Sequence, residues 1–439
     1  MSPEKNLDLF PKMTIGSQSV VPAKHTRIPM TDVTGYRIPQ SEYLKRRASL
    51  FTKIEEGTAV VLFAGKAPVA SLDEAYPFLA NRTFFYFCGI EQENSVLVLI
   101  KRGAGEDSWE ERLYIYPREP EKEKWTGRRL STEEAEEISG ISDIRMLDLL
   151  DKELDDLLDE SFNIAWDETD ISHARASFGK KVAESDRFDS VTDISGSVTL
   201  LRVVKSPAEI DAITKAIQVT EEALAVLEQS LYPGMRECEV FAIQEAEMIK
   251  RGSLFQSFST ITAGGKNTLC LHYPTPTDRI EDGEMVQIDT GARAGGYCSD
   301  ISRAYAVNGK RNDRQQALFE LICECKKTAL ETIKPGSTIA KVNEETKKTA
   351  AAGLRDLGLI PHSEKDPLEA VKKYYWHNTL HHMGLDVHDV CDREMVFVPG
   401  MVFAVEPGIY IPEWGFGFRV EDDVLLAQDG ARYLSHPQA

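Results

Sequence analysis

The chain has 439 residues, of which 42% are hydrophobic and 28% are charged, and its formal net charge is −20. This length exceeds that of a typical domain with a single hydrophobic core, so we expect two domains. The negative charge would repel a phosphate backbone and argues against nucleic acid as a partner. No apolar run reaches the ~18–20 residues that a membrane helix requires, and the first thirty residues lack a secretory pattern, so we expect no membrane partner.

The first half of the chain predicts an α/β domain behind an extended lead-in. Residues 1–40 hold several prolines and little periodicity, and the apolar pattern then predicts a helix over 41–54 and a buried strand over 57–65. Further elements are expected as strands over 83–90, 94–102 and 111–117 and as a capped helix over 131–140. This alternation defines an expected N-terminal domain over 41–175, followed by a linker over 176–199.

The second half, residues 200–439, predicts an α+β domain. Ser206 and Pro207 are typical of the start of a helix, which should end at Pro233-Gly234. Further helices are expected over 237–252, 314–336 and 339–358, and short strands over 258–264, 283–292, 301–309, 401–411, 416–427 and 431–435. This mixture favours helices packed on an antiparallel sheet.

Four acidic residues in this half stand in apolar, strand-like surroundings: Asp289, Asp300, Glu406 and Glu421. A single such residue is more often an accident at the end of a strand. Burying an unpaired carboxylate costs several kcal/mol, so four of them together favour a shared cationic ligand.

A histidine cluster lies between these acidic residues. The segment 376–389 holds four of the nine histidines of the chain, namely His377, His381, His382 and His388. An isolated histidine would most often belong to the core, but four within one short segment indicate a site. His382 follows His381 directly and should point elsewhere, so we expect it to be structural.

Four carboxylates and the imidazole of His381 form an oxygen-rich ligand set without a thiolate. Such a set favours a pair of Mn²⁺, Co²⁺, Fe²⁺ or Zn²⁺ ions over a structural zinc site of the cysteine type. Among these ions we expect Mn²⁺, although the ligand types alone leave the four open. Four negative ligands balance two such ions and leave room for a bridging hydroxide. Two ions ~3.5–4 Å apart can lower the pKa of that water and polarise a carbonyl, so the expected chemistry is hydrolysis.

The motifs around these residues resemble the pita-bread metallopeptidases, within them the Xaa-Pro aminopeptidase (aminopeptidase P) and prolidase branch. The runs HYP, DTGARAGGYCSDISR, HNTLHHMGLDVHD, FAVEPGIY and FRVEDDVLL carry the resemblance in the second half, and YPFLANRTFFYFCGI with NSVLVLIKR carries it in the first. It implies a C-terminal pita-bread catalytic domain behind an α/β creatinase-like N-terminal domain. It also implies proline-containing peptides as substrates and a homodimer or homotetramer.

The resemblance also implies a role for each of the five expected metal ligands. Asp289 would chelate one ion, Asp300 and Glu421 would bridge both ions, and His381 with Glu406 would complete the second ion. Glu406 would also carry the proton from the bridging water to the leaving nitrogen.

Further residues are implied as contacts of the substrate. His388 would donate a hydrogen bond to the developing oxyanion, and His272, His377 and Arg419 would lie near the substrate and the ligands. A prolyl nitrogen has no N–H, so a proline site can offer an apolar wall instead. Phe258 and Val387 are candidates for this wall, with core packing as the equal alternative.

Three positions depart from the pattern of the branch. Relatives commonly have arginine where Leu79 stands and an acidic residue where Thr83 stands. Phe85 replaces a tryptophan that lines a neighbouring active site in some relatives. These changes leave the expected metal ligands intact. They leave open the substrate length that the site accepts, its affinity for substrate and the contacts between subunits.

Several alternatives stay open on the sequence alone. An Xaa-Pro dipeptidase would use the same ligands, and a noncatalytic binding protein would use the same scaffold. Methionine aminopeptidase is disfavoured by the additional N-terminal domain, and creatinase by the intact ligand set. The seven dispersed cysteines have no zinc-type spacing, so we expect structural, reduced thiols in a cytoplasmic protein.

Overall fold

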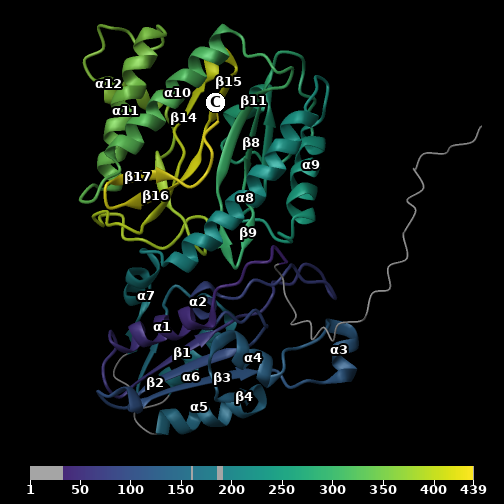
Figure 1. Cartoon of the computed structure of the whole chain (residues 1–439), viewed down its shortest axis with the longest axis vertical. Coiled ribbons are helices and arrows are strands. Elements are labelled where there is room, and N and C mark those ends of the chain that lie inside the picture. Colours follow the sequence, from purple (N-terminus) through teal and green to yellow (C-terminus); the bar gives the residue numbers. More distant parts are fainter. Residues whose placement is uncertain (1–32, 160–161, 185–190, 439) are drawn as a thin grey trace, which may run out of the picture.

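The computed structural model describes residues 33–159, 162–184 and 191–438 and has two lobes (Figure 1). The expected lead-in over 1–40 lies mostly outside these residues. The described part of it is fixed to the second lobe, because the Tyr36 hydroxyl donates to the Ala208 carbonyl oxygen at 2.7 Å and the Val33 N–H donates to Gly252. No helix among the described residues is long and apolar enough to cross a membrane.

The N-terminal lobe is a mixed sheet with helices on both faces. Its strand order is β4-β3-β2-β1-β5-β6, with bounds β1 (Thr58–Phe63), β2 (Val96–Lys101), β3 (Trp109–Ile115), β4 (Ile144–Met146), β5 (Asn163–Trp166) and β6 (Thr192–Asp193). The helices are α1 (Gln40–Phe51), α2 (Arg82–Cys88), α3 (Pro120–Thr126), α4 (Thr132–Ser139), α5 (Leu150–Asp159) and α6 (His173–Ala183). Strand β1 pairs antiparallel with β2 and parallel with β5.

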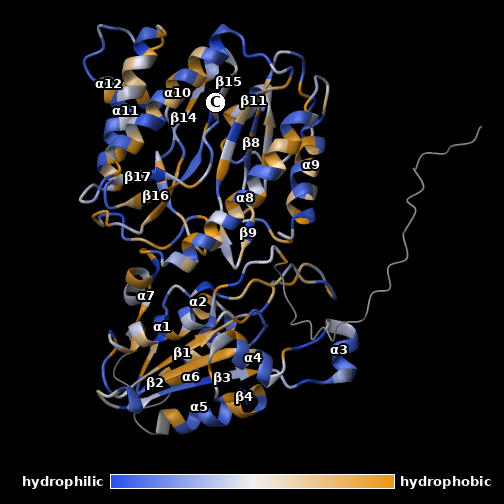
Figure 2. Ribbon diagram, in the orientation of Figure 1, coloured by the Kyte–Doolittle hydropathy of each residue, from blue (hydrophilic) through white to orange (hydrophobic). Residues whose placement is uncertain are grey.

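Alternation along β1 places its side chains in two separate cores. Val60 and Leu62 pack in the core shared with α1, α2 and α4, whereas Val61 and Phe63 pack in the core shared with α5 and α6. Every residue of β1 is therefore buried, and the central strands form a continuous hydrophobic band in Figure 2. This arrangement agrees with the α/β class expected for this half.

The expected strand over 83–90 is wrong, because this segment forms helix α2. The Asn81 side chain accepts hydrogen bonds from the backbone N–H groups of Thr83 and Phe84, and Gly89 ends the helix with φ +70°. The β-propensity of the aromatic run indicated a strand, but the cap and the left-handed glycine favour one short helix.

The expected linker over 176–199 contains ordered elements of the first lobe. It includes most of α6, all of β6 and the start of α7 (Ser195–Arg202). Strand β6 has only two residues and pairs parallel with β5, so the sheet extends beyond residue 175. A strand this short and polar has no periodicity that a sequence could show.

The C-terminal lobe holds antiparallel strands between two pairs of helices (Figure 1). The helices are α8 (Pro207–Ser230), α9 (Glu237–Lys250), α10 (Asp313–Thr332), α11 (Ile339–Asp356) and the short α12 (Pro367–Ala370). The strands are β7 (Ile261–Gly264), β8 (Met285–Thr290), β9 (Arg293–Ala294), β10 (Tyr297–Cys298), β11 (Ile301–Ala306), β12 (Leu380–His382), β13 (Val402–Val405), β14 (Gly408–Ile411), β15 (Phe416–Arg419), β16 (Asp422–Ala427) and β17 (Gly430–Tyr433). The predicted α+β class is confirmed.

The strands of this lobe form four sheets, two of which carry most of the expected ligands. One sheet has the order β11-β8-β7 and another has the order β12-β13-β16-β17, while β10-β9 and β14-β15 are hairpins.

The described residues of both lobes also include five short 3₁₀ helices: η1 (Glu106–Ser108), η2 (Leu147–Leu149), η3 (Gly265–Leu269), η4 (Val371–Lys373) and η5 (Pro412–Trp414).

A buried polar network joins the two lobes. Arg46 of α1 donates to the Tyr297 hydroxyl at 3.0 Å, and that hydroxyl donates to Glu209 Oε1 at 2.7 Å. The Arg46 guanidinium also stacks over the Tyr86 ring at 4.2 Å. The hydrophobic core continues through this contact, so the lobes are packed as one body.

Candidate metal centre

The expected ligands come from strands that are distant in sequence. Asp289 lies near the end of β8, opposite Ser302 of β11, and Asp300 immediately precedes β11. His381 lies in β12, Glu406 follows β13, and Glu421 lies between β15 and β16. Because β12, β13 and β16 are neighbours in one sheet and Glu421 N–H donates to the Ser302 carbonyl, the two sheets meet at these side chains.

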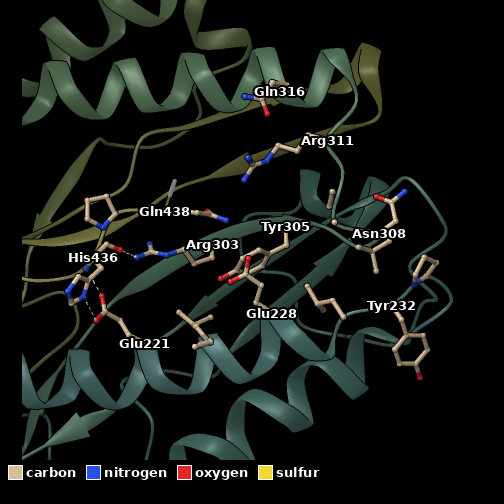
Figure 3. A pocket seen from close by; sticks show the side chains of 18 residues that line it. Glu221, Glu228, Tyr232, Arg303, Tyr305, Asn308, Arg311, Gln316, His436 and Gln438 are labelled. Carbon is tan, nitrogen blue, oxygen red and sulfur yellow. Dashed lines mark hydrogen bonds and ion pairs between the residues drawn. The ribbon is translucent and has the colours of Figure 1, made fainter.

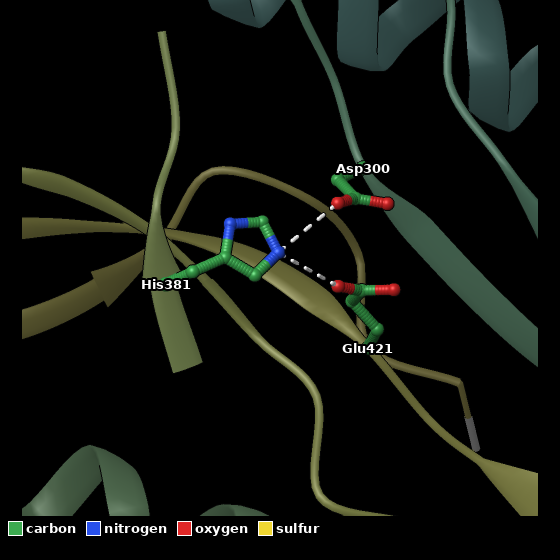
Figure 4. A group of neighbouring side chains, drawn as sticks. All are labelled: Asp300, His381 and Glu421. Carbon is green, nitrogen blue, oxygen red and sulfur yellow. Dashed lines mark ion pairs between the residues drawn. The ribbon is translucent and has the colours of Figure 1, made fainter. Parts of the chain in front are cut away.

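The His381 imidazole lies at the centre of the acidic cluster. Its Nε2 is 3.3 Å from Asp300 Oδ2, 3.8 Å from Glu406 Oε1 and 3.9 Å from Glu421 Oε1. Figure 4 shows this nitrogen directed between Asp300 and Glu421, and one ligand atom of each of these three residues lies within 4.8 Å of the others. The Nδ1 atom is 3.1 Å from the His382 carbonyl oxygen, which orients Nε2 toward the carboxylates.

Asp289 borders this cluster with two partners of its own. The Ser302 hydroxyl donates to Asp289 Oδ1 at 2.8 Å, and the Arg419 guanidinium forms an ion pair with Asp289 Oδ2. Arg419 is itself held by its backbone N–H, which donates to Gln287 Oε1 at 2.9 Å. The guanidinium therefore lies beside the expected ligands, as the resemblance implies.

Burial makes the negative charge of this cluster costly. Burial and the charges of Asp300 and Asp289 raise the pKa of Glu421 well above its usual range. Burial, with the charges of Asp289 and Glu406, also raises the pKa of Asp300 to about 7, against a hydrogen bond with His381. Burial raises the pKa of Glu406 as well, although His381 and Arg419 oppose it.

These features fit divalent metal ions. The acidic groups converge without enough nearby positive charge to hold them all ionised, and the donors are carboxylate oxygens with one imidazole nitrogen. Hard, dipositive ions stabilise this donor set at neutral pH. The residues present therefore fit the metal that the sequence predicts.

One cavity of about 1100 Å³ contains the cluster. All of the predicted site residues line it, namely Phe258, His272, Asp289, Asp300, His377, His381, Val387, His388, Glu406, Arg419 and Glu421. Phe258 and Val387 are half-buried, so each presents part of an apolar side chain to the cavity. The structure thus places the expected proline wall and the expected ligands in the same space.

Two further histidines lie beside the cluster in their neutral form. The His388 ring stacks on the His381 ring with centroids 3.8 Å apart, and burial with the charges of His381 and His272 lowers the His388 pKa to about 4. His377 Nε2 is 2.9 Å from the Tyr410 hydroxyl, and burial with the charge of Arg419 lowers the His377 pKa to about 4. Neutral His388 can therefore donate one N–H to a ligand, whereas neutral His377 donates its Nδ1–H to the Asn378 carbonyl oxygen at 2.8 Å and accepts from Tyr410 at Nε2.

Some contacts of the site were not predicted from the sequence. Tyr410 orients His377, Ser302 holds Asp289, and Asp423 accepts a hydrogen bond from the Asp300 N–H at 3.1 Å. A usable signal existed for Asp423, because it follows Glu421 inside an apolar run. The roles of Ser302 and Tyr410 depend on strand register and have no local signal.

The remaining expectations concern core residues. His382 is buried and packs against the Phe403 ring at 4.6 Å, in agreement with a structural role. All seven cysteines are free, and Cys391 also lines the cavity.

Leu79, Thr83 and Phe85 depart from the sequence pattern of the branch, and the structure shows the surroundings of each. The Thr83 hydroxyl donates to Asp167, and Leu79 is 40% exposed. Phe85 is buried against Gly296 of the second lobe, where a Cβ atom would come within 2.5 Å of the Phe85 ring. Phe85 thus contacts the second lobe of its own chain.

A second cavity, of about 920 Å³, lies along β11 between α8, α10 and residues 436–438. Figure 3 shows the side chains of Arg303, Arg311 and Gln438 in this cavity, and a hydrogen bond between Glu221 and His436. None of the predicted site residues line it. The first cavity is therefore the candidate active site.

Comparison with known proteins matches both lobes to sequence families. The profile of metallopeptidase family M24 matches residues 211–428, and that of the aminopeptidase P N-terminal domain matches residues 43–165. The chain is 32% identical over 450 residues to Xaa-Pro aminopeptidase 3 of Rattus norvegicus, covering 97% of this chain and 88% of the relative. It is 30% identical over 422 residues to Xaa-Pro aminopeptidase of Haemophilus influenzae, covering 91% and 95%.

Solved structures give the same match. The low-pH form of Escherichia coli aminopeptidase P superposes with a TM-score of 0.85 at 30% identity, covering 91% of this chain and 95% of that chain. The similarity therefore spans both lobes and the candidate metal centre.

Proposed function

Because the chain belongs to the aminopeptidase P branch of the M24 metallopeptidases, we propose that it hydrolyses the bond between an N-terminal residue and a following proline. The observation that carries this proposal is the convergence of Asp300, His381 and Glu421 in the cavity that Phe258 and Val387 also line. A peptide bound there would place its scissile bond beside the acidic cluster.

In this proposal two divalent ions, with Mn²⁺ expected and Co²⁺, Fe²⁺ or Zn²⁺ possible, are held by the five predicted ligands. Asp289 would hold one ion, Asp300 and Glu421 would bridge, and His381 with Glu406 would hold the other. When bound, such a pair supplies an activated water and polarises the carbonyl. The raised pKa values of Glu421 and Asp300 support this assignment, because both groups need a cation to ionise fully.

Glu406 is the proposed proton carrier. Its carboxylate lies 3.4 Å from His377 Nδ1 and 3.8 Å from His381 Nε2, and Glu406 lines the cavity. Burial raises the pKa of Glu406, which favours its role as a group that accepts a proton and releases it again. It would take the proton of the attacking water and deliver it to the leaving prolyl nitrogen.

Neutral histidines and an arginine would hold the substrate. His388 would donate a hydrogen bond to the carbonyl oxygen as negative charge develops there. His377 and His272 would contact the peptide, and the Arg419 guanidinium would set the shape and charge of the pocket beside Asp289. The apolar faces of Phe258 and Val387 would receive a prolyl ring, which offers no N–H to bind.

The size of the cavity favours an aminopeptidase over an Xaa-Pro dipeptidase. Pockets for small ligands commonly measure ~300–1,000 Å³, and this cavity of about 1100 Å³ can accept a peptide longer than two residues. Association into a homodimer or homotetramer and a cytoplasmic location stay predictions.

The test is a comparison of two peptides with the Mn²⁺-loaded protein. We expect release of glycine from Gly-Pro-Ala at a rate at least ~10-fold above that from the dipeptide Gly-Pro, because the longer chain gains binding energy along the cavity. Gly-Ala-Ala, which lacks proline, is the matched control and should be a poor substrate. Hydrolysis of Gly-Pro alone would support the dipeptidase, and no hydrolysis of either would support a noncatalytic protein.

A further inference from the structure

The loop that carries Val387 and His388 is held at both of its ends by one arginine. Asp386 and Asp389 flank these two residues, and the Arg202 guanidinium pairs with both carboxylates. Arg202 Nη2 lies 2.9 Å from Asp386 Oδ2 and also donates to Asp389 Oδ1. Arg202 is the last residue of α7, which lies between the two lobes in Figure 1.

A buried lysine completes this cluster. Lys205 Nζ lies 2.9 Å from Asp389 Oδ2, and the Lys205 backbone N–H donates to the Gly400 carbonyl oxygen at 2.8 Å. Arg202, Lys205 and Asp389 are only 3%, 4% and 6% exposed. Buried ion pairs rarely stabilise a protein more than apolar residues of similar size would, so a geometric role is the better explanation.

The backbone of the loop is shaped around the Asp389 carboxylate. A Cβ atom on Gly384 would lie 2.2 Å from Asp389 Oδ2, so this position requires glycine. The Asp389 N–H donates to the His382 carbonyl oxygen at 2.9 Å, which ties the far end of the loop to β12. Groups at both ends of the loop therefore hold its backbone in place.

His388 depends on this loop for its own position. Among the described residues its ring makes no hydrogen bond, and its one close ring contact is the stack on His381, with an interplanar angle of 9°. Stacking fixes the plane of a ring but resists sliding and rotation within that plane only weakly. The backbone anchors must therefore determine where the His388 N–H points.

We propose that Arg202, Lys205 and Asp389 are positioning residues that aim His388 at the scissile carbonyl of the substrate. The connection between the lobes then contributes to the rate of hydrolysis, although neither Arg202 nor Lys205 lines the cavity. This inference rests on the proposed function, because it requires that His388 stabilises the oxyanion.

A double-mutant cycle tests the inference. Lys205→Met keeps the length of the side chain but removes its charge, and we expect a 10- to 100-fold loss of kcat on Gly-Pro-Ala with KM and bound Mn²⁺ unchanged. In a His388→Ala background the same substitution should change kcat by less than 3-fold, because the group that it positions is absent. Arg202→Lys, which cannot span two carboxylates, should behave in the same way and serves if Lys205→Met does not fold.

A matched control separates positioning from a general loss of stability. Arg47→Met removes another buried cation, which pairs with half-buried Glu111 at 3.0 Å and donates to the Phe87 and Ser139 carbonyl oxygens in the N-terminal lobe, and it should lower stability without changing kcat. An equal loss of kcat from Lys205→Met with and without His388 would overturn the inference. If His388→Ala alone leaves kcat unchanged, the proposed role of His388 fails instead.

Discussion

Replacing Asp300 with alanine is expected to lower peptidase activity by at least ~10³-fold, because the ion that Asp300 would share could no longer be held. Asp300 is 4% exposed, and its carboxylate is 3.3 Å from His381 Nε2. Alanine at this buried position would supply no oxygen ligand in its place. The same variant should bind fewer metal ions per chain. Rates on Gly-Pro-Ala and elemental analysis of the purified protein give both quantities.

The control for this substitution is Asp429→Ala. Asp429 is an exposed aspartate of the same lobe that pairs with Arg432, and its loss should leave both rate and metal content unchanged. Near-normal activity of Asp300→Ala, with full metal content, would contradict the proposed bridging role of Asp300 and the two-metal mechanism.

Removing the metal is expected to make stability fall steeply between pH 7 and pH 9. Burial opposes a charge on His381, but the hydrogen bond and charge of Asp300 and the charge of Glu406 raise its pKa from 6.5 to about 9. The folded state thus holds a proton that the unfolded state has already lost, and folding stability declines as pH rises through this window. Over the whole window, from the usual value of 6.5 to above about 9, the raised pKa corresponds to a loss on the order of 3 kcal/mol.

Other histidines do not mask this effect. The pKa values of His377 and His388 are lowered to about 4, mainly by burial, and that of His382 to about 3. Above pH 7 these rings are neutral in both the folded and the unfolded state, so they contribute no slope there. Excess Mn²⁺ should flatten the profile, because metal binding needs neutral His381 and strengthens as pH rises.

Denaturant unfolding of the metal-free protein at pH 7, 8 and 9 measures this decline. His381→Gln should reduce the slope without abolishing it, because Asp300 and Glu421, whose pKa values are also raised, still hold protons that the unfolded state has lost. His362→Gln, at an exposed position of the same lobe, should keep the full slope. A metal-free protein of constant stability across this range would contradict the proposed protonation of His381. So would an unchanged slope in His381→Gln.

The convergence of the acidic side chains could be predicted from sequence, because each stands in an apolar setting where burial of a carboxylate is unusual. Glu406 directly follows the apolar run that becomes β13, and Glu421 directly precedes the run that becomes β16; a buried acidic residue in such a setting needs a partner. The family motifs then indicated which residues belong together. The fold class was predictable for the same reason, since long apolar periods specify the buried strands and helices.

What could not be predicted depends on single polar contacts, two of them between residues distant in sequence and one local. Arg202 meets Asp389 over 187 residues of sequence, and Ser302 meets Asp289 only through the register of β8 and β11. Helix α2 was missed because one side chain, Asn81, outweighs the β-propensity of the aromatic residues that follow it. In each case a polar contact determines the local structure, and the hydrophobic pattern of the sequence does not indicate that contact.

The most direct test of the proposed activity is a titration of the metal-free chain with Mn²⁺ while glycine release from Gly-Pro-Ala is followed. We expect activity to rise with added metal and to saturate near two ions per chain, with the Asp300→Ala variant inactive throughout. Absence of glycine release at every metal concentration, or full activity in the metal-free chain, would contradict a dinuclear Xaa-Pro aminopeptidase.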